Sequence, residues 1–232
     1  MTNESPTTEP RWPRLLSLAV HEFRTPVTVV AGYIRMLLKD RAGPLNDQQR
    51  HLLDEAGKSC GRLSGLIAEM SDLANLEAGT APFNRSALDL SALVTEIAAS
   101  LPPLPDREVA VRVTSSASRA TVQADPTRLR MAFAALFTAL RREVVTSPAL
   151  LVRLRQATQH GKPVLWLSIA DEEHLEAVDR STGPALGPFD EWRGGSGLSL
   201  AIARRIVSAH DGQLWSPADD PKAGAIVVLP QG

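Results

Sequence analysis

Residues 21–27 read HEFRTPV and place an ionisable cluster beside a proline inside a helical pattern. His21 is followed directly by Glu22, and Thr25 lies one helical turn further along the same face. A neutral imidazole nitrogen is a good nucleophile near pH 7. Pro26 lacks an N–H group and crowds the carbonyl of Glu22, which bends the helix at a cost of about 3 kcal/mol. The stretch therefore predicts an exposed, reactive histidine where local helix shape matters more than stability.

Two long helices with heptad patterns are expected to carry this cluster, over residues 15–39 and 48–77. Gly43 and Pro44 interrupt the pattern between them. The apolar stripe consists of Leu16, Val20, Phe23, Val27, Val30, Ile34 and Leu37, followed by Leu53, Ala56, Cys60, Leu63, Ile67, Met70 and Ala74. Helices joined by a short loop lie antiparallel, and a hairpin alone leaves much of each stripe exposed to water. We therefore predict a homodimer in which two hairpins form a four-helix bundle, with His21 exposed beside the seam.

The pattern changes near residues 78–86, where glycine and proline interrupt both periods, and an α/β two-layer domain is expected to follow. Helices are predicted over residues 87–101, 125–143 and 198–210, and strands over residues 109–114, 150–157, 162–171, 212–216 and 225–230. Asp125 is the predicted N-cap of the middle helix, with Pro126 in its first turn. The predicted organisation is a disordered N-terminus at residues 1–14, a helical domain at 15–79 and an α/β domain at 80–232.

The composition excludes several classes of protein. With 25 basic and 26 acidic residues, the chain builds no broad positive field for nucleic acid or an anionic membrane. Cys60 is the only cysteine, which excludes an internal disulfide or a multi-cysteine metal site and fits a reducing compartment. The polar N-terminus does not resemble a signal peptide, and no apolar run approaches the roughly 20 residues of a spanning helix. These features predict a cytoplasmic protein without membrane insertion.

The HEFRTP stretch resembles the H-box of two-component sensor histidine kinases, and the two heptad helices resemble their dimerisation and phosphoacceptor domain. The resemblance implies that His21 takes a phosphoryl group from ATP and passes it to an aspartate of a response-regulator receiver domain. It further implies that Glu22 acts as general base and that Thr25 positions a water that dephosphorylates the receiver. The remaining histidines, His51, His160, His174 and His210, lack such a setting and are predicted to lie at the surface.

Residues 80–232 resemble the ATP-binding domain of the same kinases, which is of the GHKL type. The stretch GGSGLSLAIARRIVSAHDG, residues 194–212, is similar to the G2 box, with Ser199 where the family commonly has glycine. The resemblance implies nucleotide contacts by Gly195, Gly197 and Leu198, since glycines and a helix N-terminus suit phosphate binding. It also assigns the adenine-binding aspartate to Asp171, the basic residue near the phosphates to Arg142 and the F-box to Phe189.

Other nucleotide motifs depart from the family pattern. The D-x-G-x-G motif reads Asp171, Glu172, Glu173, His174, Leu175 and lacks both glycines. The two asparagine positions of the N-box, the second of which ligates Mg²⁺ in the family, hold Ala135 and Ala139, and the lid is nearly deleted. Losing one such element typically costs about 10²- to 10³-fold in rate. ATP and Mg²⁺ are therefore implied by the resemblance alone, and the alanines predict a helix packed over a closed pocket in a degenerate domain.

Three interpretations stay open. The chain is an ATP-dependent sensor histidine kinase with a divergent pocket, a dimeric phosphotransferase or receiver phosphatase whose His21 is charged by a partner, or a non-enzymatic pseudokinase adaptor. The adaptor would pair with another histidine kinase or sequester a response regulator. We favour the second interpretation because the acceptor motif is whole while the ATP motifs are eroded. Any input signal is expected to arrive through another protein or through a region absent from this chain.

Overall fold

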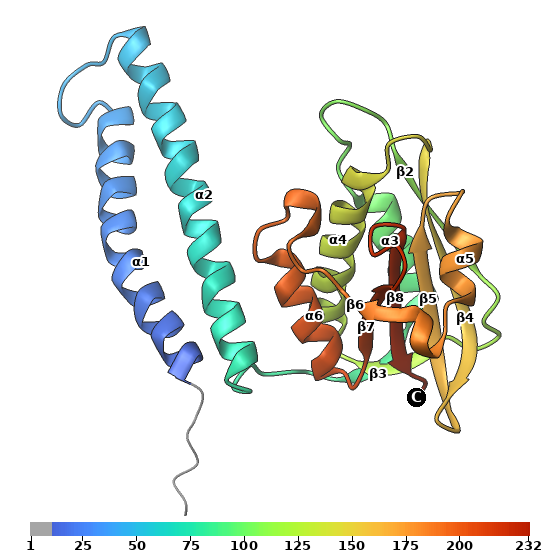
Figure 1. Cartoon of the computed structure of the whole chain (residues 1–232). Coiled ribbons are helices and arrows are strands. Elements are labelled where there is room, and N and C mark those ends of the chain that lie inside the picture. Colours follow the sequence, from blue (N-terminus) through green and yellow to red (C-terminus); the bar gives the residue numbers. More distant parts are fainter. Residues whose placement is uncertain (1–10) are drawn as a thin grey trace, which may run out of the picture. The chain divides into compact units, whose positions relative to one another are not determined.

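The computed structural model describes residues 11–232 and divides the chain between Ala81 and Pro82 into two compact units (Figure 1). We call residues 11–81 the hairpin unit and residues 82–232 the sheet unit. Each unit has its own core, and each is described by itself.

The hairpin unit consists of helices α1 (Arg11–Leu38) and α2 (Asp47–Glu77). A capping box begins α2: the Asn46 side chain accepts a hydrogen bond from the Gln49 backbone N–H, and the Gln49 side chain accepts one from the Asn46 N–H. Helix α1 begins four residues before its predicted start. Residues 11–14, which we expected to be disordered, are therefore helical, whereas residues 1–10 of that predicted segment lie outside the described residues.

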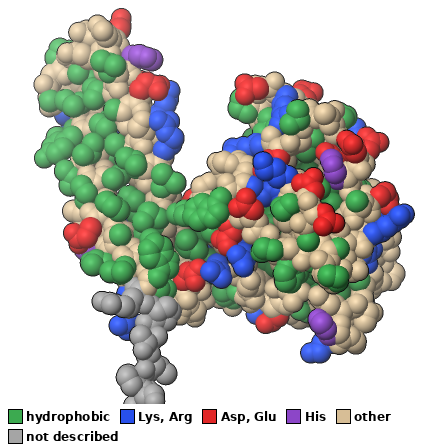
Figure 2. All heavy atoms as spheres, in the orientation of Figure 1, with side chains coloured by type: hydrophobic (Ala, Val, Ile, Leu, Met, Phe, Trp, Pro, Cys, Tyr) green, Lys and Arg blue, Asp and Glu red, His purple; other side chains and the backbone are tan. Residues whose placement is uncertain are grey.

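The predicted heptad stripe is buried only in part in the structure. Leu16, Val20, Ile34, Cys60, Ile67 and Ala74 are buried, and five further residues are partly buried: Val27, Leu37, Leu53, Ala56 and Met70. Phe23, Val30 and Leu63 belong to the same stripe but remain 53%, 49% and 48% exposed. Figure 2 shows apolar side chains crowding the visible face of this unit. A single hairpin therefore buries only part of the stripe that its sequence carries.

The sheet unit contains a six-stranded sheet with the strand order β2-β4-β5-β8-β7-β6. Strands β2 and β4 are parallel, and the other neighbouring pairs are antiparallel. The strands are β1 (Ser86–Asp89), β2 (Ala110–Ser115), β3 (Thr121–Ala124), β4 (Ala149–Gln159), β5 (Lys162–Ala170), β6 (Leu186–Pro188), β7 (Gln213–Pro217) and β8 (Gly224–Pro230). The helices are α3 (Leu90–Ser100), α4 (Pro126–Glu143), α5 (Leu175–Arg180) and α6 (Ser199–Ala209), with short 3-10 turns η1 (Gly183–Ala185) and η2 (Arg193–Gly195).

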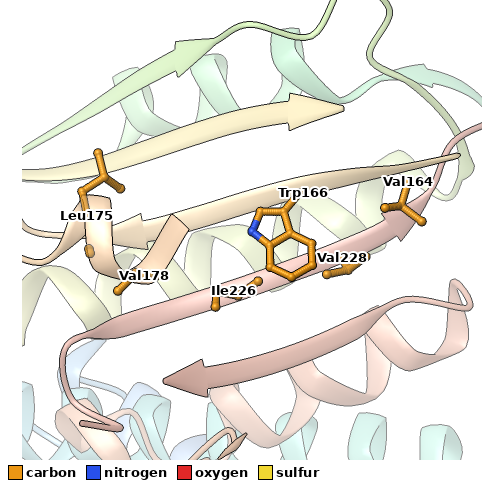
Figure 3. Packing of buried hydrophobic residues seen from close by; sticks show 7 residues of the cluster. Val164, Trp166, Leu175, Val178, Ile226 and Val228 are labelled. Atoms are coloured by element: carbon orange, nitrogen blue, oxygen red, sulfur yellow. The ribbon is translucent and has the colours of Figure 1, made fainter. Parts of the chain in front are cut away.

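The two faces of the sheet are covered differently. Helices α3, α4 and α6 lie on one face, and α5 lies on the other (Figure 1). Alternate residues of β5 pack in the apolar cores on the two faces of the sheet, because successive side chains of a strand point to opposite faces. Leu165 and Leu167 are fully buried, and Trp166 between them joins Val178 of α5 and Ile226 of β8 in a smaller apolar cluster on the opposite face (Figure 3). The predicted helical hairpin followed by an α/β layer domain is thus observed.

The predicted elements of the sheet unit are present, but one predicted helix begins later than expected and three short elements were not predicted. Residues 86–89, partly assigned to a helix from the sequence, form β1, which pairs with β3 in a separate two-stranded sheet. Asp89 then caps α3, because its side chain accepts a hydrogen bond from the Ala92 N–H. Strands β3 and β6 and helix α5 were not predicted, since each is too short to show a hydrophobic period.

His210 is buried, although the sequence led us to expect a surface residue. The Asp125 backbone N–H donates to Nε2 of His210 at 2.9 Å, and Nδ1 lies 2.8 Å from the carbonyl oxygen of Ile206. The Asp125 carboxylate accepts hydrogen bonds from the backbone N–H groups of Arg128 and Asn84, which confirms it as the N-cap of α4. His210 therefore connects the end of α6 to the beginning of α4, and burial lowers the pKa of its imidazole.

Candidate functional site

His21 lies on the exposed surface of α1, and 78% of its side chain is exposed. Nδ1 of the imidazole is 3.4 Å from Oε1 of Glu22, whose side chain is also largely exposed. Adjacent residues of a helix point about 100° apart, so this contact depends on the side-chain rotamers. The contact engages Nδ1 and leaves Nε2 available as a nucleophile.

The other two residues of the predicted cluster are exposed on the same helix. Thr25 lies one turn after His21, and Pro26 stands inside a helix that continues without interruption to Leu38. Pro26 has no N–H to donate to the carbonyl of Glu22. Two residues later, the Thr28 hydroxyl donates to the Arg24 carbonyl at 2.8 Å, a bond that often accompanies helix bending. The histidine is thus next to an interrupted stretch of the helical hydrogen-bond ladder.

The glycine-rich stretch of the sheet unit forms a tight loop before α6. Gly194, Gly195 and Gly197 have φ values of 66°, 58° and 59°, which L side chains rarely adopt. Leu198 directly precedes α6, where no side chain caps the helix N-terminus. The predicted residues Gly195, Gly197 and Leu198 are therefore brought together at a helix N-terminus, the arrangement that suits an anion.

Asp171 is engaged within its own segment. Its carboxylate accepts a hydrogen bond from the His174 backbone N–H at 2.9 Å and contacts Nδ1 of the His174 ring at 2.7 Å. The hydrogen bond to Asp171 raises the pKa of His174. Leu175, which occupies the second glycine position of the family motif, is buried and begins α5. These residues attach a helix to the sheet at the point where the family has a glycine turn.

Ala139 and the glycine loop pack directly against each other. A Cβ atom added to Gly194 would lie 2.9 Å from the Ala139 carbonyl oxygen and 3.0 Å from its Cβ. Ala139 is completely buried, and Ala135 is partly buried on the same helix. Arg142 is exposed, and its guanidinium lies 3.5 Å from the Gly194 carbonyl. The loop therefore occupies the space that an asparagine side chain at position 139 would need.

Arg193 was not identified from the sequence, yet its side chain is only 2% exposed. Nε donates to Oε2 of Glu143 at 2.7 Å, and Nη2 donates to the same oxygen at 2.5 Å. Nη1 donates to the carbonyls of Pro221 and Gly224, and Nη2 also donates to the carbonyl of Lys222. A guanidinium has five N–H donors, so every donor of Arg193 has an acceptor.

A small cavity borders the Arg193 guanidinium next to Asp171. Its volume is about 30 Å³, and its lining comprises Leu140, Glu143, Val144, Leu150, Ile169, Ala170, Asp171, Arg193, Lys222, Ala223 and Gly224. Ligand pockets in proteins usually measure about 300 to 1,000 Å³. The cavity beside Asp171 is therefore much smaller than a usual ligand pocket in this conformation.

The described residues also do not fit a bound magnesium ion. Both asparagine positions hold alanine, and within residues 11–232 no three His, Cys, Asp or Glu side chains are grouped to hold a metal. Magnesium prefers carboxylate and other oxygen ligands in octahedral geometry, which alanine cannot supply.

The hydrophobic pattern gave no sign of the contacts of Arg193, Glu143 and His210, because each contact joins segments far apart in the sequence. Arg193 and Glu143 are 50 residues apart, and His210 and Asp125 are 85 apart. The position of Arg193 immediately before the glycines was the only local signal.

Residues 13–79 match the model of the His Kinase A (phospho-acceptor) domain. The match covers α1 from Pro13 onward and all of α2, and it includes His21. In the part of the chain that the structure describes, no helix combines the length and hydropathy needed to cross a bilayer.

Curated relatives extend the similarity over most of the chain. The cell-division control histidine kinase PdhS of Brucella ovis is 24% identical over 225 residues, which is 90% of this chain and 21% of that protein. PdhS of Brucella abortus is 23% identical with the same coverage. The chain thus spans about one fifth of the length of these relatives.

Two solved structures share the fold. Full-length ShkA in complex with AMPPNP superposes with a TM-score of 0.66 at 24% identity, covering 95% of this chain and 46% of ShkA. The histidine kinase AdeS of Acinetobacter baumannii has a TM-score of 0.52 at 17% identity, covering 91% of this chain and 98% of AdeS. At these identities the likeness concerns the fold alone.

Proposed function

We propose that the chain is a homologue of histidine kinases and that His21 exchanges a phosphoryl group with the aspartate of a response-regulator receiver domain. Support comes from the match of residues 13–79 to the His Kinase A (phospho-acceptor) domain and from the similarity to PdhS. The observation that carries this proposal is the geometry of the imidazole, which is exposed, contacts Glu22 through Nδ1 and presents Nε2 to a partner.

The proposed phosphoryl transfer needs only His21, Glu22 and the aspartyl phosphate of the receiver. The lone pair of His21 Nε2 attacks the phosphorus of the receiver's aspartyl phosphate. The P–N bond forms while the P–O bond to the aspartate breaks, and the electron pair of that bond leaves with the aspartate carboxylate. The carboxylate of Glu22, 3.4 Å from Nδ1, accepts the proton that the charged ring would otherwise retain. The reverse steps return the phosphoryl group to the receiver.

Thr25 is assigned a different role. Its hydroxyl lies one turn from His21 on the exposed surface of α1, where it can hold a water near the docked receiver. Such a water would attack the aspartyl phosphate and release inorganic phosphate. Substitution of Thr25 should therefore reduce receiver dephosphorylation more than phosphoryl transfer to His21.

We also propose a homodimer. Phe23, Val30 and Leu63 continue the buried heptad stripe but are about half exposed in a single hairpin. A second copy would bury them by the same packing that joins α1 to α2, since two hairpins complete a four-helix bundle.

The sheet unit is proposed to be a degenerate ATP-binding domain that does not use ATP to phosphorylate His21. Support comes from the cavity of about 30 Å³ beside Asp171 and from the contact between Ala139 and Gly194. One observation favours the alternative of an ATP-dependent kinase: the glycine loop and the α6 N-terminus keep the geometry of an anion site. ShkA, whose fold is similar, was solved in complex with AMPPNP.

Phosphoryl transfer to the purified chain distinguishes these functions. The protein would be incubated with a phosphorylated receiver domain and, separately, with γ-labelled ATP and Mg²⁺. We expect label on His21 from the receiver and none from ATP. His21→Ala should abolish the label, whereas His51→Ala, which removes an exposed histidine of α2, should leave it unchanged.

Each other outcome has a definite meaning. Label on His21 from ATP would establish the kinase alternative. The absence of label from both donors would support a non-enzymatic adaptor. Equal labelling of the His21→Ala protein would show that the phosphoacceptor lies elsewhere.

A further inference from the structure

We propose that Arg193 and Glu143 form an internal latch that fills the nucleotide pocket of the sheet unit and holds it closed. The inference rests on the proposed function only in treating the sheet unit as an ATP-binding type of domain. It does not depend on His21.

The latch is a complete binding site for a guanidinium group. The five N–H donors of Arg193 meet a carboxylate oxygen of Glu143 and the carbonyls of Pro221, Lys222 and Gly224. The guanidinium carbon also lies 5.8 Å from the centre of the Phe189 ring, within the range of a cation–π contact. A buried charge with all its donors satisfied holds one geometry, because moving it would leave several polar groups without partners.

The acceptors come from two segments of the chain that border the pocket. Glu143 is the last residue of α4, Pro221 and Lys222 belong to the turn between β7 and β8, and Gly224 begins β8. Arg193 itself lies in η2, directly before the glycine loop. One side chain therefore fastens the loop, the helix and the sheet to each other across the space next to Asp171.

The neighbouring Gly194 holds the glycine loop against α4 at Ala139, although neither residue lines the cavity next to Asp171. Gly194 lies so near Ala139 that an added Cβ would be 2.9 Å from the Ala139 carbonyl. Asp171 is meanwhile held by His174. The remaining cavity of about 30 Å³ cannot receive an adenine ring, so nucleotide entry requires Arg193 to leave its acceptors.

This arrangement makes nucleotide affinity depend on the latch. When only a small fraction of molecules is open, the apparent Kd exceeds the intrinsic Kd by the inverse of that fraction. Removing both partners of the ion pair should raise the open fraction without leaving an unpaired buried charge. Removing Arg193 alone should also open the pocket but leaves Glu143 partly buried.

Calorimetric titration with ATP and, separately, with adenosine tests the latch. We expect no heat of binding for the wild-type chain and binding of both ligands by the R193A/E143A double variant, with an apparent Kd at least about tenfold below the wild-type limit. Adenosine tests the base pocket without the phosphates. The matched control is R204A, which removes the ion pair of Arg204 with Glu191 in the middle of α6, where the Arg204 side chain is 39% exposed, and it should behave as wild type.

Two results would overturn the latch. Equal binding by the wild type and the double variant would mean that Arg193 does not close the pocket. A folded double variant that binds neither ligand would mean that the pocket is lost rather than latched.

If the double variant fails to fold by circular dichroism, R193K carries the test, because an ammonium has three donors and cannot satisfy all five interactions. R193K should then show a partial gain in binding, and no gain would overturn the proposal. Phosphoryl transfer to His21 is measured independently of these outcomes.

Discussion

Gly194 approaches the backbone of Ala139 so closely that only a residue without a side chain fits at position 194. A Cβ on Gly194 would lie 2.9 Å from the Ala139 carbonyl oxygen and 3.1 Å from its Cα. Gly195 has a similar φ of 58° but has no atom within 4 Å of an added Cβ. Substitutions at these two glycines therefore share the cost of a positive φ, but only a substitution at Gly194 adds a steric contact with Ala139.

We predict that Gly194→Ala destabilises the sheet unit more than Gly195→Ala. Both substitutions place alanine at positive φ, which costs about 1 to 2 kcal/mol. Gly194→Ala also collides with α4, and such overpacking adds about 1 to 3 kcal/mol. Urea unfolding of both variants measures the difference. Equal free energies of unfolding would show that the loop can move away from Ala139.

A second prediction concerns the exposed residues of the heptad stripe. Val30→Glu combined with Leu63→Glu should convert the predicted dimer into a monomer, because the interface would have to bury four carboxylates without partners. Gln48→Glu, an exposed change in the first turn of α2, is the matched control and should leave the dimer intact. Light scattering after size-exclusion chromatography measures the mass. A wild-type monomer at micromolar concentration would contradict the dimer.

The buried His210 predicts a pH dependence of stability. Burial lowers the pKa of its imidazole below the usual value, so below about pH 6.5 the unfolded chain binds a proton that the folded chain does not. The contribution of His210 to stability is therefore present above about pH 6.5 and is lost as the pH falls toward the folded pKa, by at most about 1.4 kcal/mol per pH unit. Protonation would set an N–H of Nε2 against the N–H of Asp125. His210→Gln should flatten this dependence in urea unfolding between pH 7.5 and 5.5.

His174 provides a control because its contribution to stability depends on pH in the opposite direction. Its hydrogen bond with Asp171 raises its pKa, so its contribution is fully present below about pH 6.5 and is lost as the pH rises through the folded pKa. The ring is 38% exposed, and solvent screening makes this contribution small. His174→Gln should therefore leave the loss of stability at low pH intact or make it slightly steeper. A wild-type chain equally stable at pH 7.5 and 5.5 would contradict the role of His210.

We predict that Pro26 lowers the stability of the hairpin unit but speeds phosphoryl transfer to His21. Pro26→Ala restores an N–H that can bond to the Glu22 carbonyl, and a proline in a helix interior costs about 3 kcal/mol relative to alanine. The variant should unfold at higher urea concentration, while phosphoryl transfer to His21 should slow because the helix changes shape beside the ring. Pro13→Ala is the matched control, since Pro13 lies in the first turn, where its missing N–H has no helical acceptor. Unchanged transfer by Pro26→Ala would remove the proline from the mechanism.

Much of the fold follows from local patterns. The two heptad helices, the strands β4, β5 and β8 and the N-cap at Asp125 were all predicted, because periodic burial and capping depend on residues close in the sequence. The exposed position of His21 was predicted for the same reason, since it lies beside the apolar stripe rather than within it. Short elements such as β1 and α5 exist only through tertiary packing and could not be read from periodicity.

By itself, the sequence determined that a histidine and a carboxylate lie on an amphipathic helix and that two nucleotide motifs lack residues. Only the tertiary structure decided what fills the space left by the missing residues. Alanine at position 139 admits the backbone of Gly194, and the guanidinium of Arg193 reaches acceptors on α4 and on the β7–β8 turn. Whether the pocket is closed depends on which polar groups from distant segments form hydrogen bonds in the interior, because a buried donor without an acceptor is costly. Composition and periodicity carry no information about those meetings.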